Sequence, residues 1–257
     1  MRYGEKLGRR IEATGSRLCV GLDPRPEWIE GRVVDFLERV VKETLPHAAC
    51  FKPNMAYFES MGRAGYEALE SLFQWIPEDC PVILDAKRGD IGATQAHYAK
   101  AYFENWNVDA VTLSPYMGMD SIAPFLAYPG RGVYLLGVTS NPGAADLQLQ
   151  RVGERFLFEL VQDFAQRAAG LPGDVGLVVG LTNAAEEVMD RVRDLPLLLP
   201  GLGAQGGELS SLRIEERQAP WVVNVSRGIS FAEPEKSFQE KAQAYADQIA
   251  RIARGND

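Results

Sequence analysis

The segment DAKRGDIGAT, residues 85–94, carries the residues whose types and spacing most clearly suggest chemistry. Asp85 and Lys87 are two residues apart at the end of an apolar run, so in a strand their side chains point to the same side. Asp90 follows in the next turn. A lysine between two carboxylates is expected to stay protonated, which suits proton donation and does not suit Schiff-base chemistry. On spacing alone, a structural ion-pair network is the alternative.

A second group of residues predicts a site for an anion. Residues 200–208 read PGLGAQGGE, a glycine-rich loop whose backbone N–H groups are free to approach a phosphate. The segment NVSRG supplies Arg227, whose guanidinium can make charge-assisted hydrogen bonds to the same group. The glycines at 201, 203 and 206 also match G-x-G-x-x-G. A dinucleotide fingerprint, however, should follow an early strand and open directly into a helix, whereas this segment follows six other candidate strands and continues with Gly207.

These residues need a scaffold that brings distant segments together, and short apolar runs rich in β-branched residues predict one. The runs are residues 17–23, 49–54, 81–86, 109–114, 132–139, 176–182, 195–201 and 221–226. Each is nearly continuous in apolar character, as strands buried on both faces are. Most intervening segments show helical periodicity. Residues 140–153 instead predict a long loop.

Parallel strands that alternate with helices predict a (βα)8 TIM barrel, here a single domain of 257 residues. A doubly wound sheet is the structural alternative. In a barrel the carboxyl ends of the strands converge on one face, where barrel enzymes hold their active sites. The polar residues at these predicted strand ends are Asp23, Lys52, Asn54, Asp85, Lys87, Ser114, Ser140, Gln205 and Arg227. Because buried charges are costly unless paired, we expect the lysines and aspartates to meet.

Composition narrows the classes of function. The net charge of −8, from 35 acidic and 27 basic residues, argues against binding to the phosphate backbone of nucleic acid. No stretch approaches the roughly 18 apolar residues of a membrane span. The N-terminal sequence lacks the apolar core of a secretory signal. Cys19, Cys50 and Cys80 lie in or beside apolar runs and predict reduced, buried thiols in a cytoplasmic protein. The two histidines are distant and lack paired ligand spacing, so no catalytic metal is expected.

Several motifs, in order along nearly the whole chain, resemble the orotidine 5'-phosphate decarboxylase family, in particular its longer bacterial subgroup. They are LCVGLDP (18–24), FKPNMAYFE (51–59), LDAKRGDIGAT (84–94), TSNPGA (139–144), PGLGAQGG (200–207) and VSRG (225–228). The specific pattern D-x-K-x-x-D-I-x-x-T is complete. Ser226 is a small departure, since many members have glycine before the arginine.

The resemblance implies a barrel that forms a homodimer with active sites at the interface. It also implies cofactor-free decarboxylation of orotidine 5'-phosphate to UMP and CO2, the last step of de novo UMP synthesis. The implied catalytic residues are Lys87, Asp85, Asp90 and Lys52. The implied substrate-binding residues are Asp23, Asn54, Ile91, Thr94, Ser140, Gln205, Gly206, Ser226 and Arg227.

Roles follow from the same resemblance. Asp23 and Lys52 would contact the ribose hydroxyls, and Ser140 the pyrimidine. Asp85 would lie near the substrate carboxylate, and Lys87 would protonate carbon 6. Gln205 would link base and phosphate, and Arg227 would bind the phosphate. Asp90, Ile91 and Thr94 would reach into the partner's site.

The implied chemistry has a physical basis, and two other functions stay open. Loss of CO2 leaves negative charge at carbon 6 without an electron sink, and the Lys87 ammonium would stabilise it and then supply the proton. Whether Asp85 opposes the substrate carboxylate or orients Lys87 is open. One alternative is another phosphate-binding barrel acting on a sugar phosphate, such as a hexulose-phosphate synthase or a pentose-phosphate epimerase, which a metal requirement would favour. The other is a non-catalytic nucleotide-binding protein.

Overall fold

The computed structural model describes residues 1–202 and 217–254, and within them eight parallel strands form one sheet in the order β2-β1-β10-β9-β8-β5-β4-β3. The strands are β1 (Leu18–Leu22), β2 (Ala48–Pro53), β3 (Ile83–Arg88), β4 (Ala110–Leu113), β5 (Gly132–Val138), β8 (Asp174–Val179), β9 (Leu197–Pro200) and β10 (Trp221–Val225). Parallel bridges Phe51–Val82 and Asn54–Asp85 join β2 to β3, the two ends of this order. The sheet therefore closes into the predicted (βα)8 barrel, and an open doubly wound sheet is excluded.

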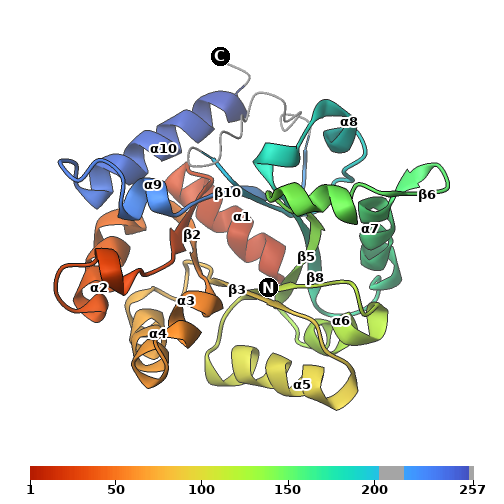
Figure 1. Ribbon diagram of the computed structural model, residues 1–257, viewed down its shortest axis with the longest axis horizontal. Helices are drawn as coiled ribbons and strands as arrows, with labels where there is room; N and C mark the ends of the chain where they lie inside the picture. The colour runs from red at the N-terminus through yellow and green to blue at the C-terminus, as the bar shows by residue number, and fades with distance from the viewer. Residues whose placement is uncertain (203–216, 255–257) are drawn as a thin grey trace.

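Helices surround the strands (Figure 1). The α-helices are α1 (Tyr3–Thr14), α2 (Val33–Thr44), α3 (Met55–Ser60), α4 (Arg63–Trp75), α5 (Gly92–Lys100), α6 (Met119–Leu126), α7 (Leu157–Arg167), α8 (Glu186–Met189), α9 (Arg227–Ser230) and α10 (Phe238–Ala253). Short 3-10 turns lie at η1 (Pro26–Trp28), η2 (Leu45–His47), η4 (Pro142–Asp146) and η5 (Leu181–Asn183), and a π-helical turn, η3 (Ala101–Asn105), follows α5. None of the described helices is long and apolar enough to cross a membrane.

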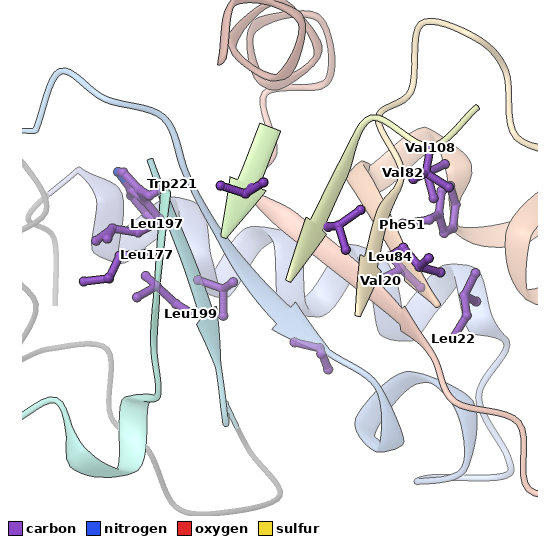
Figure 2. Close-up of a cluster of buried hydrophobic side chains, with 14 of the residues drawn as sticks. Val20, Leu22, Phe51, Val82, Leu84, Val108, Leu177, Leu197, Leu199 and Trp221 are labelled. Atoms are coloured by element: carbon purple, nitrogen blue, oxygen red, sulfur yellow. The ribbon is translucent and has the colours of Figure 1, made fainter. Parts of the chain in front are cut away.

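The strands are apolar on both faces because each face packs against a different layer. Val20 and Leu22 of β1, Leu84 of β3 and Leu199 of β9 belong to the large cluster between strands and helices (Figure 2). The alternate positions, such as Cys19, belong to a second cluster inside the barrel. This double burial explains why the strand sequences are nearly continuous in apolar character.

The first helix, α1, closes the amino-terminal end of the barrel. Tyr3 and Leu7 pack among the barrel's interior side chains, and the hydroxyl oxygens of Tyr3 and Tyr134 are 3.1 Å apart. Lys6 forms an ion pair with Asp109, which directly precedes β4. Because this end of the barrel is filled by α1, the opposite end, at the carboxyl ends of the strands, remains for a site.

Residues 140–153 contain more structure than the predicted long loop, so that prediction is wrong in part. The turn η4 lies within this segment, and β6 (Arg151–Val152) pairs antiparallel with β7 (Arg155–Phe156). Gly153 has φ +66°, a left-handed conformation that suits the two-residue connection between the paired Val152 and Arg155. Each strand has two residues, too few for a period-2 pattern in the sequence.

Candidate active site

Two adjoining cavities lie at the carboxyl ends of the strands. The outer cavity has a volume of about 430 Å³ and the inner one about 110 Å³, and both are lined by Lys52, Asp85 and Ser140. The predicted site residues that line one or both cavities are Asp23, Lys52, Asn54, Asp85, Lys87, Ser140, Ser226 and Arg227. A cavity of about 620 Å³ lies against Lys6 and Asp109 at the opposite end of the barrel, away from these residues.

Asp85 is the centre of a hydrogen-bonded network of charged groups. Its Oδ2 accepts a hydrogen bond from Lys52 Nζ at 2.8 Å, and its Oδ1 accepts one from Lys87 Nζ at 2.6 Å. Thr112 Oγ1 also donates to Oδ1, at 2.8 Å. The Lys52 and Asp85 side chains are almost completely buried, whereas the Lys87 side chain is 49% exposed and lines the inner cavity. Lys87 is therefore the most exposed of the three charged side chains, although Lys52 and Asp85 also line both cavities.

The arrangement inverts the expected lysine between two carboxylates. Within this chain a carboxylate, Asp85, lies between two lysines. The carboxylate of Asp90 instead caps its own loop, where its Oδ1 accepts a hydrogen bond from the backbone N–H of Ile91 at 2.8 Å. The sequence predicted that the lysines and aspartates meet, but not that Lys52 pairs with Asp85, because β2 meets β3 through barrel closure, which spacing alone does not reveal.

The network fixes the charge of its buried members. Burial by itself would raise the pKa of Asp85, but the positive charges of Lys52 and Lys87 outweigh burial and hold that pKa well below its usual range. Burial would lower the pKa of Lys52, but the negative charges of Asp85 and Asp23 outweigh it and raise that pKa. Both groups are ionised at neutral pH. The lowered pKa of Asp85 means that its contribution to stability is present at neutral pH and lost as the pH falls into the acid range.

A bulge in β3 turns Lys87 toward the cavity. Leu84 pairs with Val111 and Arg88 with Leu113, so β3 has two residues more than β4 over this stretch. Lys87 lies in this irregular stretch with φ +47° and donates its backbone N–H to Thr112 Oγ1 at 3.0 Å. Asp85 and Lys87 do meet as predicted, but through a bulge rather than through regular strand alternation.

Thr112 was not predicted as a site residue. It is buried in β4 and connects the Lys87 backbone to the Asp85 carboxylate through its one hydroxyl. A threonine inside an otherwise apolar run was the available signal, because a buried hydroxyl requires a partner.

The outer cavity contains polar groups that have no partner in the described part of the chain. They are the buried atoms Asp23 Oδ1, Arg25 Nε and Ser226 Oγ. Ser226 lies close to the end of β1, since a Cβ atom at Gly21 would lie 2.7 Å from Ser226 Cβ. Arg227, the first residue of α9, also lines this cavity. Unsatisfied polar groups that line a cavity are suited to bind a polar ligand.

The remaining predicted residues do not line either cavity as described. Ile91 is 61% exposed, and Thr94 is exposed at the start of α5. Gln205 and Gly206 lie outside the described residues. Across residues 1–202 and 217–254, no group of three or more His, Cys, Asp or Glu side chains could hold a metal ion.

Comparison with known proteins identifies a family. Residues 16–242 match the model of the "Orotidine 5'-phosphate decarboxylase / HUMPS family". The chain is 46% identical to orotidine 5'-phosphate decarboxylase of Variovorax paradoxus, and the match covers 96% of both chains. It is 42% identical to the protein of the same name from Cupriavidus necator, over 96% of this chain and 95% of that one.

Solved structures agree with the sequence comparisons. A putative orotidine-monophosphate decarboxylase from Toxoplasma gondii superposes with a TM-score of 0.90 at 36% identity, over 99% of this chain and 98% of that one. The orotidine-monophosphate decarboxylase of Leishmania donovani gives a TM-score of 0.85 at 36% identity, over 99% of both chains. The barrel, the cavity residues and these relatives together show that the chain belongs to the orotidine 5'-phosphate decarboxylase family.

Proposed function

We propose that this chain decarboxylates orotidine 5'-phosphate to UMP and CO2 without a cofactor, at the cavities that contain Asp85 and Arg227. The observation that carries the proposal is the ionised Asp85 between Lys52 and Lys87, in a site that continues into the cavity lined by Arg227. The family description includes a second group, HUMPS. The nearly full-length relatives named as orotidine 5'-phosphate decarboxylase favour the decarboxylase.

The geometry supports a direct route for the proton. The electrons of the bond to the departing CO2 remain on carbon 6, where the ammonium of Lys87 stabilises them, and a proton then moves from Lys87 Nζ to that carbon. Solvent returns the proton to the lysine, whose side chain is half-exposed. Asp85 is ionised, so it can oppose the substrate carboxylate, and it is hydrogen-bonded to Lys87, so it can also orient it. Both proposed roles of Asp85 are compatible with this arrangement.

The outer cavity is proposed to hold the rest of the nucleotide. Asp23, Lys52 and Asn54 would face the ribose, Ser140 the pyrimidine, and Ser226 and Arg227 the phosphate. Gln205 and Gly206 would complete the set. Phosphate binding is remote from the reacting bond, yet its energy can favour closure of the site around the substrate.

We also infer a cytoplasmic homodimer in which Asp90, Ile91 and Thr94 of one chain complete the site of the other. The exposure of Ile91 and Thr94, and their absence from the described cavity walls, support this role. The three free, buried cysteines support the location.

The proposed reaction is tested by adding orotidine 5'-phosphate with excess chelator and following the loss of its ultraviolet band. We expect turnover with release of UMP and CO2. Turnover of a sugar phosphate that chelator abolishes would instead support the other barrel enzymes. Tight nucleotide binding without turnover would support a binding protein.

Replacing Arg227 by alanine should weaken use of the phosphorylated substrate. The variant loses a charge-assisted contact that lies away from the reacting carbon, so KM should rise. The ratio kcat/KM should fall roughly 30- to 1,000-fold, which corresponds to about 2–4 kcal/mol of lost transition-state stabilisation. Activity on orotidine, which lacks the phosphate, should barely change. Steady-state kinetics on both substrates measure this, and equal losses would show that Arg227 acts elsewhere.

Replacing Thr112 by valine should reduce kcat by about 30-fold, with little change in KM. The change removes one hydrogen bond to Asp85 and leaves the Lys87 N–H without its acceptor, each worth about 1 kcal/mol. Thr112→Ser keeps the hydroxyl and should restore activity. If the serine variant is as impaired as the valine variant, packing rather than the hydroxyl is responsible.

A further inference from the structure

Arg25 is a cavity residue for which the sequence motifs suggested no role. It lies just beyond β1, two residues after Asp23, and lines the outer cavity. Its Nη2 donates a hydrogen bond to the Tyr57 hydroxyl at 3.0 Å, whereas its Nε is buried and has no partner in the described part of the chain. No described carboxylate lies within 4.0 Å of its guanidinium, so this charge is not neutralised there.

Aromatic rings hold the Arg25 guanidinium in place. Its Cζ lies 4.3 Å from the ring centroid of Trp28 and 5.4 Å from that of Tyr57. Trp28 packs edge-to-face on Phe231, the residue that follows α9, with 5.3 Å between centroids. These contacts fix the orientation of the guanidinium. Because neither the rings nor the Tyr57 hydroxyl carries a negative charge, the guanidinium keeps its full positive charge for a ligand.

Arg25 and Arg227 follow neighbouring strands of the barrel. Val20 of β1 pairs with Val225 of β10, and the close packing of Gly21 on Ser226 keeps the ends of these strands together. Arg227, like Arg25, has no described carboxylate within 4.0 Å. The same cavity wall holds the buried, unpartnered hydroxyl of Ser226. Two guanidinium groups without a carboxylate partner and one hydroxyl match the charge and acceptor geometry of a phosphate dianion.

We propose that Arg25 is a second phosphate-binding residue, which holds the phosphomonoester of the substrate together with Arg227. The inference rests on the proposed function for the identity of the nucleotide. Beyond that function, we infer that the group bound is a dianionic phosphomonoester and that the loop after β1 contributes to binding it.

Isothermal titration of Arg25→Ala with UMP, ribose 5-phosphate and uridine tests the proposal. We expect the Kd for UMP and for ribose 5-phosphate to rise by about 10- to 100-fold, because a desolvated charge-assisted contact is worth about 1.5–3 kcal/mol. The Kd for uridine should stay within about twofold of the wild-type value, since uridine has no phosphate for the lost cation to bind. Arg25→Gln removes the charge but keeps a planar polar side chain, and it serves if the alanine variant does not fold.

Arg17→Ala is the matched control. Arg17 Cζ also lies 4.3 Å over a tryptophan ring, that of Trp221, but this residue precedes β1 and lines neither active-site cavity. The control removes the same charge and the same type of stacking, so binding of all three ligands should match the wild type. Arg25→Lys keeps the charge without the planar fork and should recover part of the UMP affinity.

Three outcomes separate this proposal from others. Equal weakening of UMP and uridine by Arg25→Ala would mean a role in the nucleoside part or in the shape of the cavity, and would overturn the proposal. Unchanged UMP binding with normal wild-type decarboxylation would overturn it and leave the proposed function intact. Arg25-dependent binding of ribose 5-phosphate by a wild-type protein that does not decarboxylate orotidine 5'-phosphate would support Arg25 and reject the proposed function.

Discussion

Replacing Lys87 by alanine should lower kcat by more than the roughly 10⁴-fold upper range of simple general-acid catalysis. The change removes both the proton that carbon 6 receives and the positive charge that faces the developing carbanion. Asp85 stays ionised in the variant, because Lys52 Nζ remains 2.8 Å from its Oδ2. The inner cavity would then contain an uncompensated carboxylate near the departing CO2. Single-turnover kinetics with orotidine 5'-phosphate measure the effect.

The control for Lys87→Ala is Lys42→Ala, the same chemical change on the surface of α2. Lys42 is 67% exposed and paired with Glu38 at 2.7 Å, so its loss should leave kcat and thermal stability nearly unchanged. Circular dichroism should show that both variants fold. Retention of more than a tenth of wild-type activity by Lys87→Ala would reject the proposed role of the lysine.

Mixing two inactive variants should restore activity if the active sites are shared between chains. We expect Asp90→Ala and Lys87→Ala each to be nearly inactive as homodimers. In a mixed dimer one site carries both lesions and the other carries neither. With random exchange about half of the dimers are mixed, so about a quarter of wild-type activity should return, by the symmetry of a two-fold interface.

The geometry makes this complementation informative. Asp90 follows Lys87 by three residues, yet its carboxylate is engaged with the Ile91 N–H and lines neither described cavity. If Asp90 served its own chain's site, every site in the mixture would contain one lesion, and activity would stay at the level of the single variants. Exchange is verified with subunits that carry different affinity tags. No recovery after verified exchange would reject the shared site and leave the decarboxylase proposal standing.

The barrel could be predicted from sequence because its strands are buried on both faces. Cys19 faces the barrel interior while Val20 and Leu22 face the helices, so the sequence of the strand is apolar at successive positions rather than at alternate ones. The convergence of Asp23, Lys52, Asp85 and Arg227 then followed from the geometry of a barrel. The two-residue strands β6 and β7 could not be predicted, because pairs this short depend on the turn at Gly153.

The contacts inside the site could not be read from the sequence. Lys52 is 33 residues from Asp85 and meets it only through closure of the barrel. Thr112 resembles any β-branched strand residue until its hydroxyl is seen between Asp85 and the Lys87 backbone. Arg25 resembles an ordinary loop arginine until the aromatic rings beside it are located. Such contacts depend on strand register and rotamers, which periodicity does not encode.

At position 87 the residue that catalysis requires is not the residue that the backbone conformation favours. Lys87 has φ +47°, a backbone conformation that glycine or asparagine adopts with less strain. The strained backbone carries the catalytic side chain, which is half-exposed. Lys87→Gly would release that strain while abolishing turnover. A library of this enzyme selected for thermal resistance alone would therefore enrich glycine or asparagine at position 87, and directed evolution must include a catalytic screen to keep the lysine.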